Sequence, residues 1–206
     1  MPKKNRIDGK AVSIGSPRAA KAAGIGMALI PEDRKTEGLM LQMSVRDNLS
    51  FAALAELAHG GIIDRNAERD AVDEMIKLLA IRTDGVSAPA GSLSGGNQQK
   101  LVIAKWLMRQ PRIILLNDPT RGIDVGTKQE IYALLRKLAL SGAAIVLYST
   151  DYDELIGCCD RVLVLYDGTV KRTLSGAEIT ERALISSALN IDISPGEAER
   201  QAPAGA

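Results

Sequence analysis

Apolar residues along the chain form two kinds of pattern: short continuous runs, and stretches in which they recur at helical spacing. A short continuous run bounded by turn residues is typical of a strand buried on both faces of a parallel sheet. Spacing of three and four residues instead predicts an amphipathic helix. The runs predict strands at "MALI", "RIILLND", "AAIVLYST" and "RVLVLYDG". The helical spacing predicts helices over about 44–58, 64–81, 94–110, 128–142, 151–160 and 176–189.

The order of these elements predicts an α/β fold, a parallel sheet flanked by helices. A helical subregion is expected over about 44–110, inside the α/β pattern. Turns are predicted at Asp8-Gly9 and, between two hairpin strands, at Asp167-Gly168. A short helix is expected from Ser16-Pro17 to about Gly24, and the polar tail 191–206 is expected to be disordered.

Charge and aromatic content exclude some partners. Lys and Arg total 26 and Asp and Glu total 25, so no overall field attracts the chain to nucleic acid or anionic lipid. Aromatic residues make up only 3%, which predicts an aliphatic core and argues against stacking on single-stranded nucleic acid. No apolar run approaches the roughly 20 residues of a membrane helix. These features predict a soluble, cytoplasmic protein with no nucleic-acid partner.

The stretch "SLSGGNQQKL", residues 92–101, places two glycines directly before an apolar helix. Ser94 can cap that helix, and Gly95 and Gly96 allow another group to approach the backbone closely. A helix N-terminus also offers N–H groups and a partial positive charge. The stretch therefore predicts a site for an anion, most plausibly a terminal phosphate; the plainer alternative is a capped helix after a glycine turn.

Polar residues also follow the predicted strands. Asn117 and Asp118 end "IILLND", and ligands of open parallel sheets lie beyond the carboxyl ends of strands. This pair could bind a magnesium-bound water and orient an attacking water, although an Asn/Asp turn before proline is common. Asp124 lies in the next loop, "TRGIDVG", and Thr150 ends the following strand.

Taken in order, these motifs resemble the nucleotide-binding ATPase of ABC transporters. "LSGGNQQK" is similar to the family's signature motif, "IILLNDPT" to its second nucleotide motif, and "RGID" to its dimer-interface loop. "SPRAAKAAGIG", "IPEDRKTEGL", "MSVRDNLS" and "PTRGIDVGTKQEIY" resemble more closely the C-terminal half of tandem ATPases for bacterial uptake of ribose, galactose or xylose. The resemblance covers about residues 7–190, which implies one partial ATPase domain over that range.

The resemblance implies roles for individual residues. In the signature, Ser94, Gly95, Gly96 and Asn97 are expected to contact ATP held by another domain. Asn117 would hold magnesium through water, and Asp118 would be the catalytic carboxylate.

Three further positions follow from the same resemblance. Asp124 would lie in the interface loop, Glu32 at the position of the family's loop glutamine, and Thr150 at that of its switch histidine. The departures from the family pattern weaken any site built on this chain alone. Asn117 replaces an Asp and contributes no charge, and Asp118 is one methylene shorter than the usual Glu. A misplacement of about 1 Å can cost about 100-fold in rate.

The family's phosphate loop, G-x-x-x-x-G-K-[ST], is not found in the sequence. The chain is therefore expected to lack the first strand, the phosphate loop and the following helix, and to be inactive alone in ATP hydrolysis, the family's activity. The implied cofactors are ATP and Mg. The implied partners are a second ABC ATPase domain that supplies a phosphate loop, membrane-spanning permease subunits and, indirectly, a periplasmic sugar-binding protein. The implied location is peripheral, at the inner face of the plasma membrane.

Three hypotheses follow. The chain could contribute the signature motif to a composite ATP site of a sugar importer. It could instead be a truncated, inactive ATPase without independent ATP binding, which would expose apolar surface and self-associate. A non-transport ABC ATPase of translation or DNA repair is disfavoured by the near-neutral charge.

Overall fold

The computed structural model describes residues 5–7, 9–13, 15–16, 19 and 26–191. They belong to two compact units, Met1–Tyr148 and Ser149–Ala206. Near the N-terminus, β1 (Asn5–Ile7) and β2 (Lys10–Val12) form an antiparallel hairpin, with Gly9 at φ +78° in the predicted turn. The predicted helix at 16–24 and the predicted tail lie almost entirely outside the described residues.

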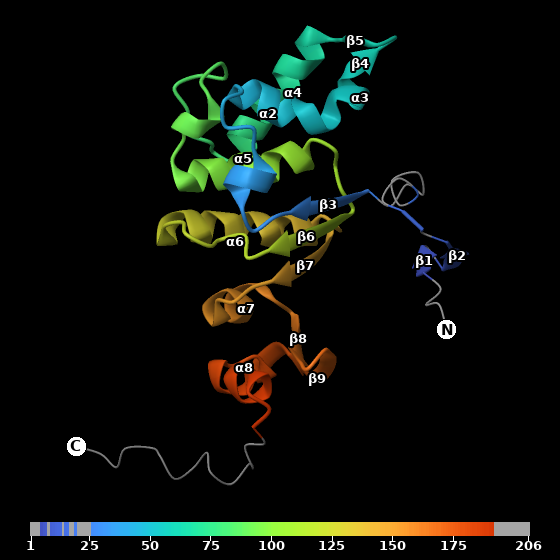
Figure 1. Cartoon of the computed structure of the whole chain (residues 1–206), viewed down its shortest axis with the longest axis vertical. Coiled ribbons are helices and arrows are strands. Elements are labelled where there is room, and N and C mark those ends of the chain that lie inside the picture. The colour runs from blue at the N-terminus through green and yellow to red at the C-terminus, as the bar shows by residue number, and fades with distance from the viewer. Residues whose placement is uncertain (1–4, 8, 14, 17–18, 20–25, 192–206) are drawn as a thin grey trace, which may run out of the picture. The chain divides into compact units, whose positions relative to one another are not determined.

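Three parallel strands form the sheet of the first unit. They are β3 (Met27–Ile30), β6 (Ile113–Asn117) and β7 (Ala144–Tyr148), in the order β3-β6-β7 (Figure 1). Because the strands are parallel, their carboxyl ends meet at one edge, where Asn117 of β6 lies opposite Tyr148 of β7. The predicted fold class, a parallel sheet flanked by helices, is confirmed.

Two helices cover one face of this sheet. Helices α5 (Gly95–Leu107) and α6 (Val125–Leu140) pack against β3 and β7 respectively, and also against each other. The strand residues beneath them are almost completely buried: Ala28, Ile30, Ile114 and Leu116. Leu101 and Ile131 contribute the matching apolar side chains from the helices.

In the described part of the chain, the opposite face of the sheet is exposed along β3 and β7 and half-buried along β6. Successive side chains of a strand point to opposite faces, and here the second set is 49–60% exposed: Met27, Leu29, Val146 and Tyr148. The continuous apolar runs predict that each strand is buried on both faces. For β3 and β7 that prediction is wrong. The runs supply apolar side chains to both faces, and the described helices of this unit, α5 and α6, cover one of them.

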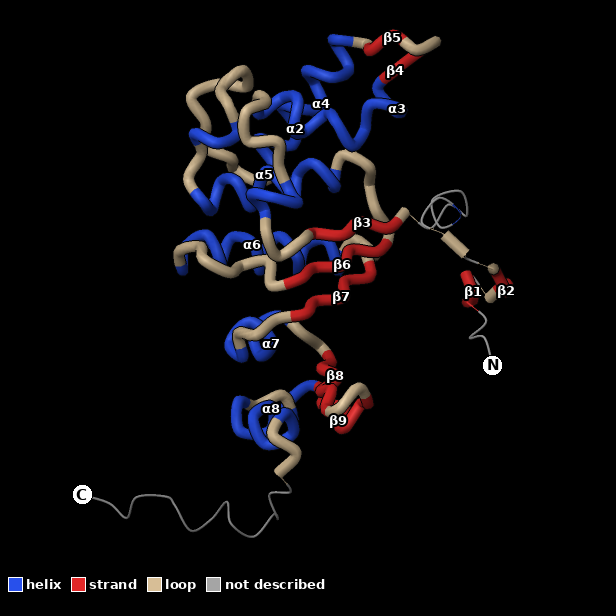
Figure 2. Tube along the Cα trace, in the orientation of Figure 1, coloured by secondary structure: helices blue, strands red, loops and turns tan. Residues whose placement is uncertain are grey.

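The helical subregion forms one end of the first unit (Figure 2). It comprises α2 (Val45–Ser50), a 3-10 turn η2 (Phe51–Ala53), α3 (Leu54–Leu57) and α4 (Arg65–Leu78), close to the predicted helices. A two-residue hairpin, β4 (Ala58–His59) and β5 (Ile62–Ile63), occupies the predicted break at "HGGIID". Helix α2 packs on α4 and α5 and so joins the subregion to the rest of the core.

The segment after β3 contains a short π-helical turn, η1 (Arg34–Gly38), where only a loop is predicted. Asp33 caps this turn, since its carboxylate accepts the N–H groups of Lys35 and Thr36 at 2.8 and 3.3 Å. Gly38 then lies against α5, where a Cβ would come within 2.8 Å of Val102 Cγ2. The turn therefore follows from a local cap and a long-range contact, and neither has a periodic signal.

The second unit contains α7 (Tyr152–Cys158), β8 (Arg161–Tyr166), β9 (Thr169–Ser175), a 3-10 turn η4 (Gly176–Glu178) and α8 (Glu181–Ala188). Strands β8 and β9 form the predicted hairpin, and Asp167 and Gly168 both have positive φ, +47° and +69°, as a tight hairpin turn requires. Among the described residues β8 pairs only with β9, so it does not extend the parallel sheet.

A small aliphatic core holds this second unit together, formed by Val162, Val164, Leu174, Ile179 and Leu184. In neither unit is a described helix long and apolar enough to span a membrane.

Candidate functional site

Ser94 caps α5, as the sequence predicts. Its hydroxyl oxygen accepts the backbone N–H of Asn97 at 3.4 Å and the Asn97 side-chain amide at 2.9 Å. The amide oxygen of Asn97 in turn accepts the backbone N–H of Arg82 at 2.8 Å. Asn97 therefore ties the start of α5 to the segment after α4, while Ser94 itself remains exposed.

Gly95 and Gly96 do allow a close approach, but the groups that approach belong to this chain. The ideal Cβ position on Gly95 lies 2.9 Å from Arg34 Nη2 and 3.8 Å from the carbonyl oxygen of Gly122. On Gly96 it lies 2.7 Å from the hydroxyl oxygen of Thr127 and 2.8 Å from its methyl carbon. The two glycines therefore let η1 and the start of α6 pack against the start of α5.

At the end of β6 the chain turns sharply. Asp118 has φ +41°, in the left-handed region, and its N–H donates to the carbonyl of Tyr148 at 2.9 Å. Its own carbonyl accepts the N–H of Arg121 at 3.2 Å, which closes the turn. Asp118 is only 6% exposed, and Asn117 beside it is half-buried. The two residues lie together at the carboxyl edge of the sheet, as predicted.

Asp124 has a local structural role as the N-cap of α6. One carboxylate oxygen accepts the N–H of Thr127 at 2.9 Å, and the other accepts the Thr127 hydroxyl at 2.8 Å. These bonds favour the ionised carboxylate, so its pKa is lowered, chiefly by the Thr127 backbone N–H. The cap also fixes the side chain of Thr127 against Gly96.

Glu32 contacts the loop after β6. Its carboxylate forms an ion pair with the guanidinium of Arg121. Arg34 contacts the same loop. Its Nη1 donates a hydrogen bond to the backbone carbonyl of Arg121 at 3.1 Å. The segment after β3 is thus bound twice to the loop that carries Asp124.

Sequence reasoning missed three residues of this arrangement: Arg34, Arg121 and Thr127. Thr127 has a detectable signal, because it lies three residues after Asp124, the spacing of a side-chain cap. The charges of "PEDR" and "TRG" mark loops, but nothing in the sequence indicates which carbonyl or glycine each arginine meets.

Thr150 belongs to a different unit from these residues. Within the second unit it is exposed and precedes α7. The cap of that helix is Asp151, whose carboxylate accepts the N–H groups of Asp153 and Glu154 at 3.0 and 3.3 Å.

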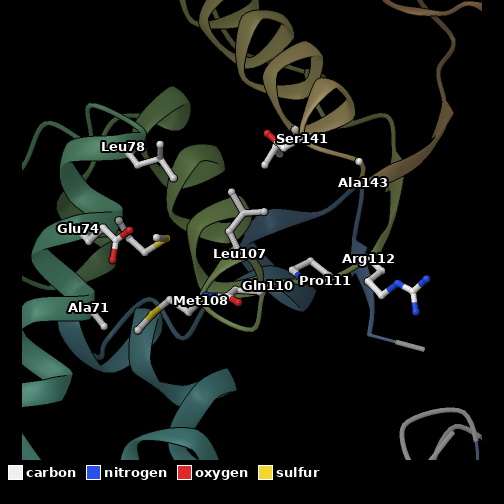
Figure 3. A pocket seen from close by; sticks show the side chains of 13 residues that line it. Ala71, Glu74, Leu78, Leu107, Met108, Gln110, Pro111, Arg112, Ser141 and Ala143 are labelled. Carbon is white, nitrogen blue, oxygen red and sulfur yellow. The ribbon is translucent and has the colours of Figure 1, made fainter. Parts of the chain in front are cut away.

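A cavity of about 480 Å³ lies in the first unit, away from these residues (Figure 3). Its wall comes from α4, from the last turns of α5 and α6, and from the segments that lead into β6 and β7, for example Leu78, Leu107, Leu138 and Pro111. These segments mark the amino ends of the strands, whereas Asn117 and Asp118 mark the carboxyl ends. No predicted site residue lines the cavity, so it does not coincide with the candidate site.

The chain belongs to the ABC transporter family, whose pattern it matches over residues 1–121. Two solved structures support the fold, each at 22% sequence identity. The ATP-binding cassette MJ0796, in a dimeric post-hydrolysis state with ADP and Pi, has a TM-score of 0.68 over 82% of this chain and 71% of that one. The protein cbiO1 of Clostridium perfringens, part of an ABC transporter complex, has a TM-score of 0.67 over 89% of this chain and 68% of that one.

Several similar proteins are named for ribose import. The ribose import ATP-binding protein RbsA 1 of Mesorhizobium japonicum is 77% identical over 185 residues, and that of Rhizobium johnstonii is 70% identical. RbsA of Geobacillus kaustophilus is 46% identical over 182 residues. These matches cover 88–90% of this chain but only 36% of each relative, so the chain spans about a third of the length of the proteins it resembles.

Proposed function

We propose that this chain is the signature-bearing part of the ATP-binding subunit of a sugar importer. In this proposal Ser94 to Asn97 close on the terminal phosphate of an ATP that a second ATPase domain holds in its phosphate loop. ATP hydrolysis at the shared site would drive monosaccharide uptake, and ribose is the sugar that the relatives' names suggest. Those names also favour transport over translation or DNA repair.

The geometry at the start of α5 is the observation that carries the proposal. Ser94 is exposed, and the N–H groups of Gly95 and Gly96 have no hydrogen-bond acceptor in the part of the chain that the structure describes. Unpaired N–H groups at the N-terminus of a 13-residue helix suit an anion. Since the space beside both glycines is filled by Arg34 and Thr127, an anion would approach along the helix axis.

The same residues fit ATP and magnesium only in part. In the described part of the chain, no three His, Cys, Asp or Glu side chains gather to hold a metal ion. Asn117 and Asp118 could offer at most an amide and a carboxylate oxygen, and no phosphate-loop sequence is present to hold the β- and γ-phosphates. Magnesium, where bound, would neutralise phosphate charge, and it would arrive with the nucleotide. The chain alone is therefore expected not to hydrolyse ATP.

The partners follow from the same proposal. Besides the second ATPase domain, membrane-spanning permease subunits would bind the chain, and a periplasmic sugar-binding protein would act indirectly. The surface around the helical subregion, with Glu32–Lys35 nearby, is the proposed docking region. The chain would then lie at the inner face of the plasma membrane.

The test is ATP-dependent association of the full chain with a separately produced ABC ATPase domain that carries a phosphate loop. Ser94→Asp retains a good helix cap but places a negative charge against the phosphate, and like charges in contact cost several kcal/mol. We expect association to weaken at least about 10-fold. Ser94→Asn is the matched control, because it caps equally well without a charge and should associate nearly normally.

Sedimentation velocity with and without ATP and Mg measures this association. Equal association of the Ser94→Asp and Ser94→Asn chains would refute the proposal. If the unsubstituted chain showed no ATP-dependent association at all, the alternative of an inactive ATPase without its own ATP site would be favoured instead.

A further inference from the structure

The side chain of Arg34 lies among three segments that are distant in the sequence. It comes from η1, it donates from Nη1 to the carbonyl of Arg121 at 3.1 Å, and its Nη2 rests against Gly95. The residues Arg34 and Arg121 are 87 positions apart in the chain. One side chain thus connects the segment after β3, the loop after β6 and the start of α5.

The direction of this side chain is set by the turn that carries it. Asp33 accepts the N–H groups of the two residues after Arg34, which holds the start of η1 in one conformation. At the other end of η1, the carbonyl of Gly38 accepts a hydrogen bond from the buried Lys105 of α5. Hydrogen bonds therefore fix the backbone at both ends of η1, and the Arg34 side chain extends from it toward Gly95.

Among the described residues the structure shows no ion pair within 4.0 Å for Arg34, although Asp33 lies close enough for the charge of Arg34 to lower its pKa. The carboxylate of Glu32 pairs with Arg121, and that of Asp33 is occupied by the cap. Arg34 Nε is buried and has no hydrogen-bond partner among the described residues. A buried N–H donor without a partner lowers the stability of the fold, so an arginine at this position needs a specific explanation. Here the guanidinium adds positive charge to the helix end that already favours an anion.

The close contact between Arg34 and Gly95 determines what a side chain at position 95 would displace. A Cβ on Gly95 would come within 2.9 Å of Nη2, the far end of a flexible side chain. Arg34 can swing away from such a clash at little cost to the fold, but it would then lose its hydrogen bond to the carbonyl of Arg121. Glycine at position 95 therefore keeps the Arg34 guanidinium in place. It has little effect on the free energy of unfolding.

We propose that Arg34 is a positioning residue for the signature segment. It sets the spacing between the start of α5 and the loop after β6, so that Ser94 and the N–H groups of Gly95 and Gly96 present one anion-binding surface to the partner's nucleotide. This inference rests on the proposed function. It adds a residue outside the signature itself and a reason for the glycine that follows Ser94.

The experiment compares Arg34→Gln, Arg34→Lys, Gly95→Ala and the Arg34→Gln/Gly95→Ala double variant in the full chain. The readouts are the ATP concentration for half-maximal association with a phosphate-loop ATPase domain and, separately, the thermal unfolding midpoint. Arg34→Gln should raise the half-maximal ATP concentration about 10-fold, the effect expected when one charged hydrogen bond is lost. The unfolding midpoint should change little. Arg69→Gln, an exposed arginine of α4, is the control and should change neither readout.

Gly95→Ala should resemble Arg34→Gln, and the double variant should be no worse than either single variant, because both changes remove the same contact. Arg34→Lys should restore part of the ATP dependence, since an ammonium group can still donate to the Arg121 carbonyl. Additive effects, or an Arg34→Gln chain with unchanged ATP dependence, would overturn the inference while leaving the proposed function standing. Absence of ATP-dependent association in the unsubstituted chain would overturn both.

Discussion

Substitution of Gly96 by alanine is the sharpest test of the packing around the candidate site. The new Cβ would lie 2.7 Å from the Thr127 hydroxyl oxygen and 2.8 Å from its methyl carbon, whereas carbon atoms pack best at about 3.5–4.0 Å. Thr127 cannot move away easily. It is β-branched, it lies in the first turn of α6, and its hydroxyl is bonded to Asp124 at 2.8 Å. Either α5 or α6 must shift.

The expected magnitude comes from two opposing terms. Overpacking a filled site costs about 1–3 kcal/mol, while replacing glycine by alanine inside a helix returns up to about 1 kcal/mol. The Gly96→Ala chain should therefore be about 1–2 kcal/mol less stable. For a domain of this size that corresponds to a Tm lower by roughly 2–8 °C. Thermal unfolding followed by circular dichroism measures the change.

Two further variants identify the cause. A Thr127→Ala background removes the two shortest contacts and keeps the Cβ contact of 3.1 Å, so Gly96→Ala should cost less there than in the unsubstituted chain. Gly157→Ala in α7 is the matched control, because its Cβ would meet nothing within 4 Å and should leave the Tm unchanged or slightly raised. A Gly96→Ala chain as stable as the unsubstituted one, or equal costs in both Thr127 backgrounds, would refute the packing argument.

Three other variants test separate features of the chain. The pKa of Asp124 is lowered from 3.8 by its bonds to Thr127, so its stabilisation is present above about pH 3.8 and is lost as the pH falls through the folded-state pKa. Asp124→Asn should therefore flatten the acid decline in urea midpoints measured from pH 5 to 2. Burial lowers the pKa of Lys105 from 10.5, so the folded state binds fewer protons and stability should rise with pH toward 10.5. Lys105→Met should abolish that rise, which urea midpoints from pH 7 to 10.5 would show. The exposed apolar face along β3 and β7 is expected to cause concentration-dependent self-association, and Val146→Thr should reduce it without lowering the Tm; sedimentation that shows no self-association, or equal self-association of both chains, would contradict this.

The local parts of the fold could be predicted because their signals are local. The apolar run at 112–118 and the helical spacing over about 128–142 predicted the elements that the structure places at Ile113–Asn117 and Val125–Leu140, and the serine before the glycine pair predicted the cap of α5. These elements depend on side chains within a few positions of each other. Hydrophobic periodicity and capping residues can therefore be recognised in the sequence alone. The assignment of Asn117 and Asp118 to one edge of the sheet needed only the further rule that parallel strands end together.

The two short features that periodicity missed had a different origin. The π-helical turn η1 depends on the Asp33 cap and on the contact of Gly38 with Val102, and the hairpin of β4 and β5 is only two residues per strand. Neither is long enough to produce a repeating pattern, so each looks like a loop in the sequence. Their positions became clear only from what they pack against.

By itself, the sequence determined the α/β order of elements, the caps and the residues that carry the family resemblance. Each of these depends on residues that are adjacent or regularly spaced in the chain. Only the tertiary structure decided what fills the space beside Gly95 and Gly96, since Arg34 and Thr127 reach them from other segments of the chain. It also decided which face of the sheet the helices bury, because an apolar run places side chains on both faces; among the described residues, those of β3 and β7 on the other face remain exposed.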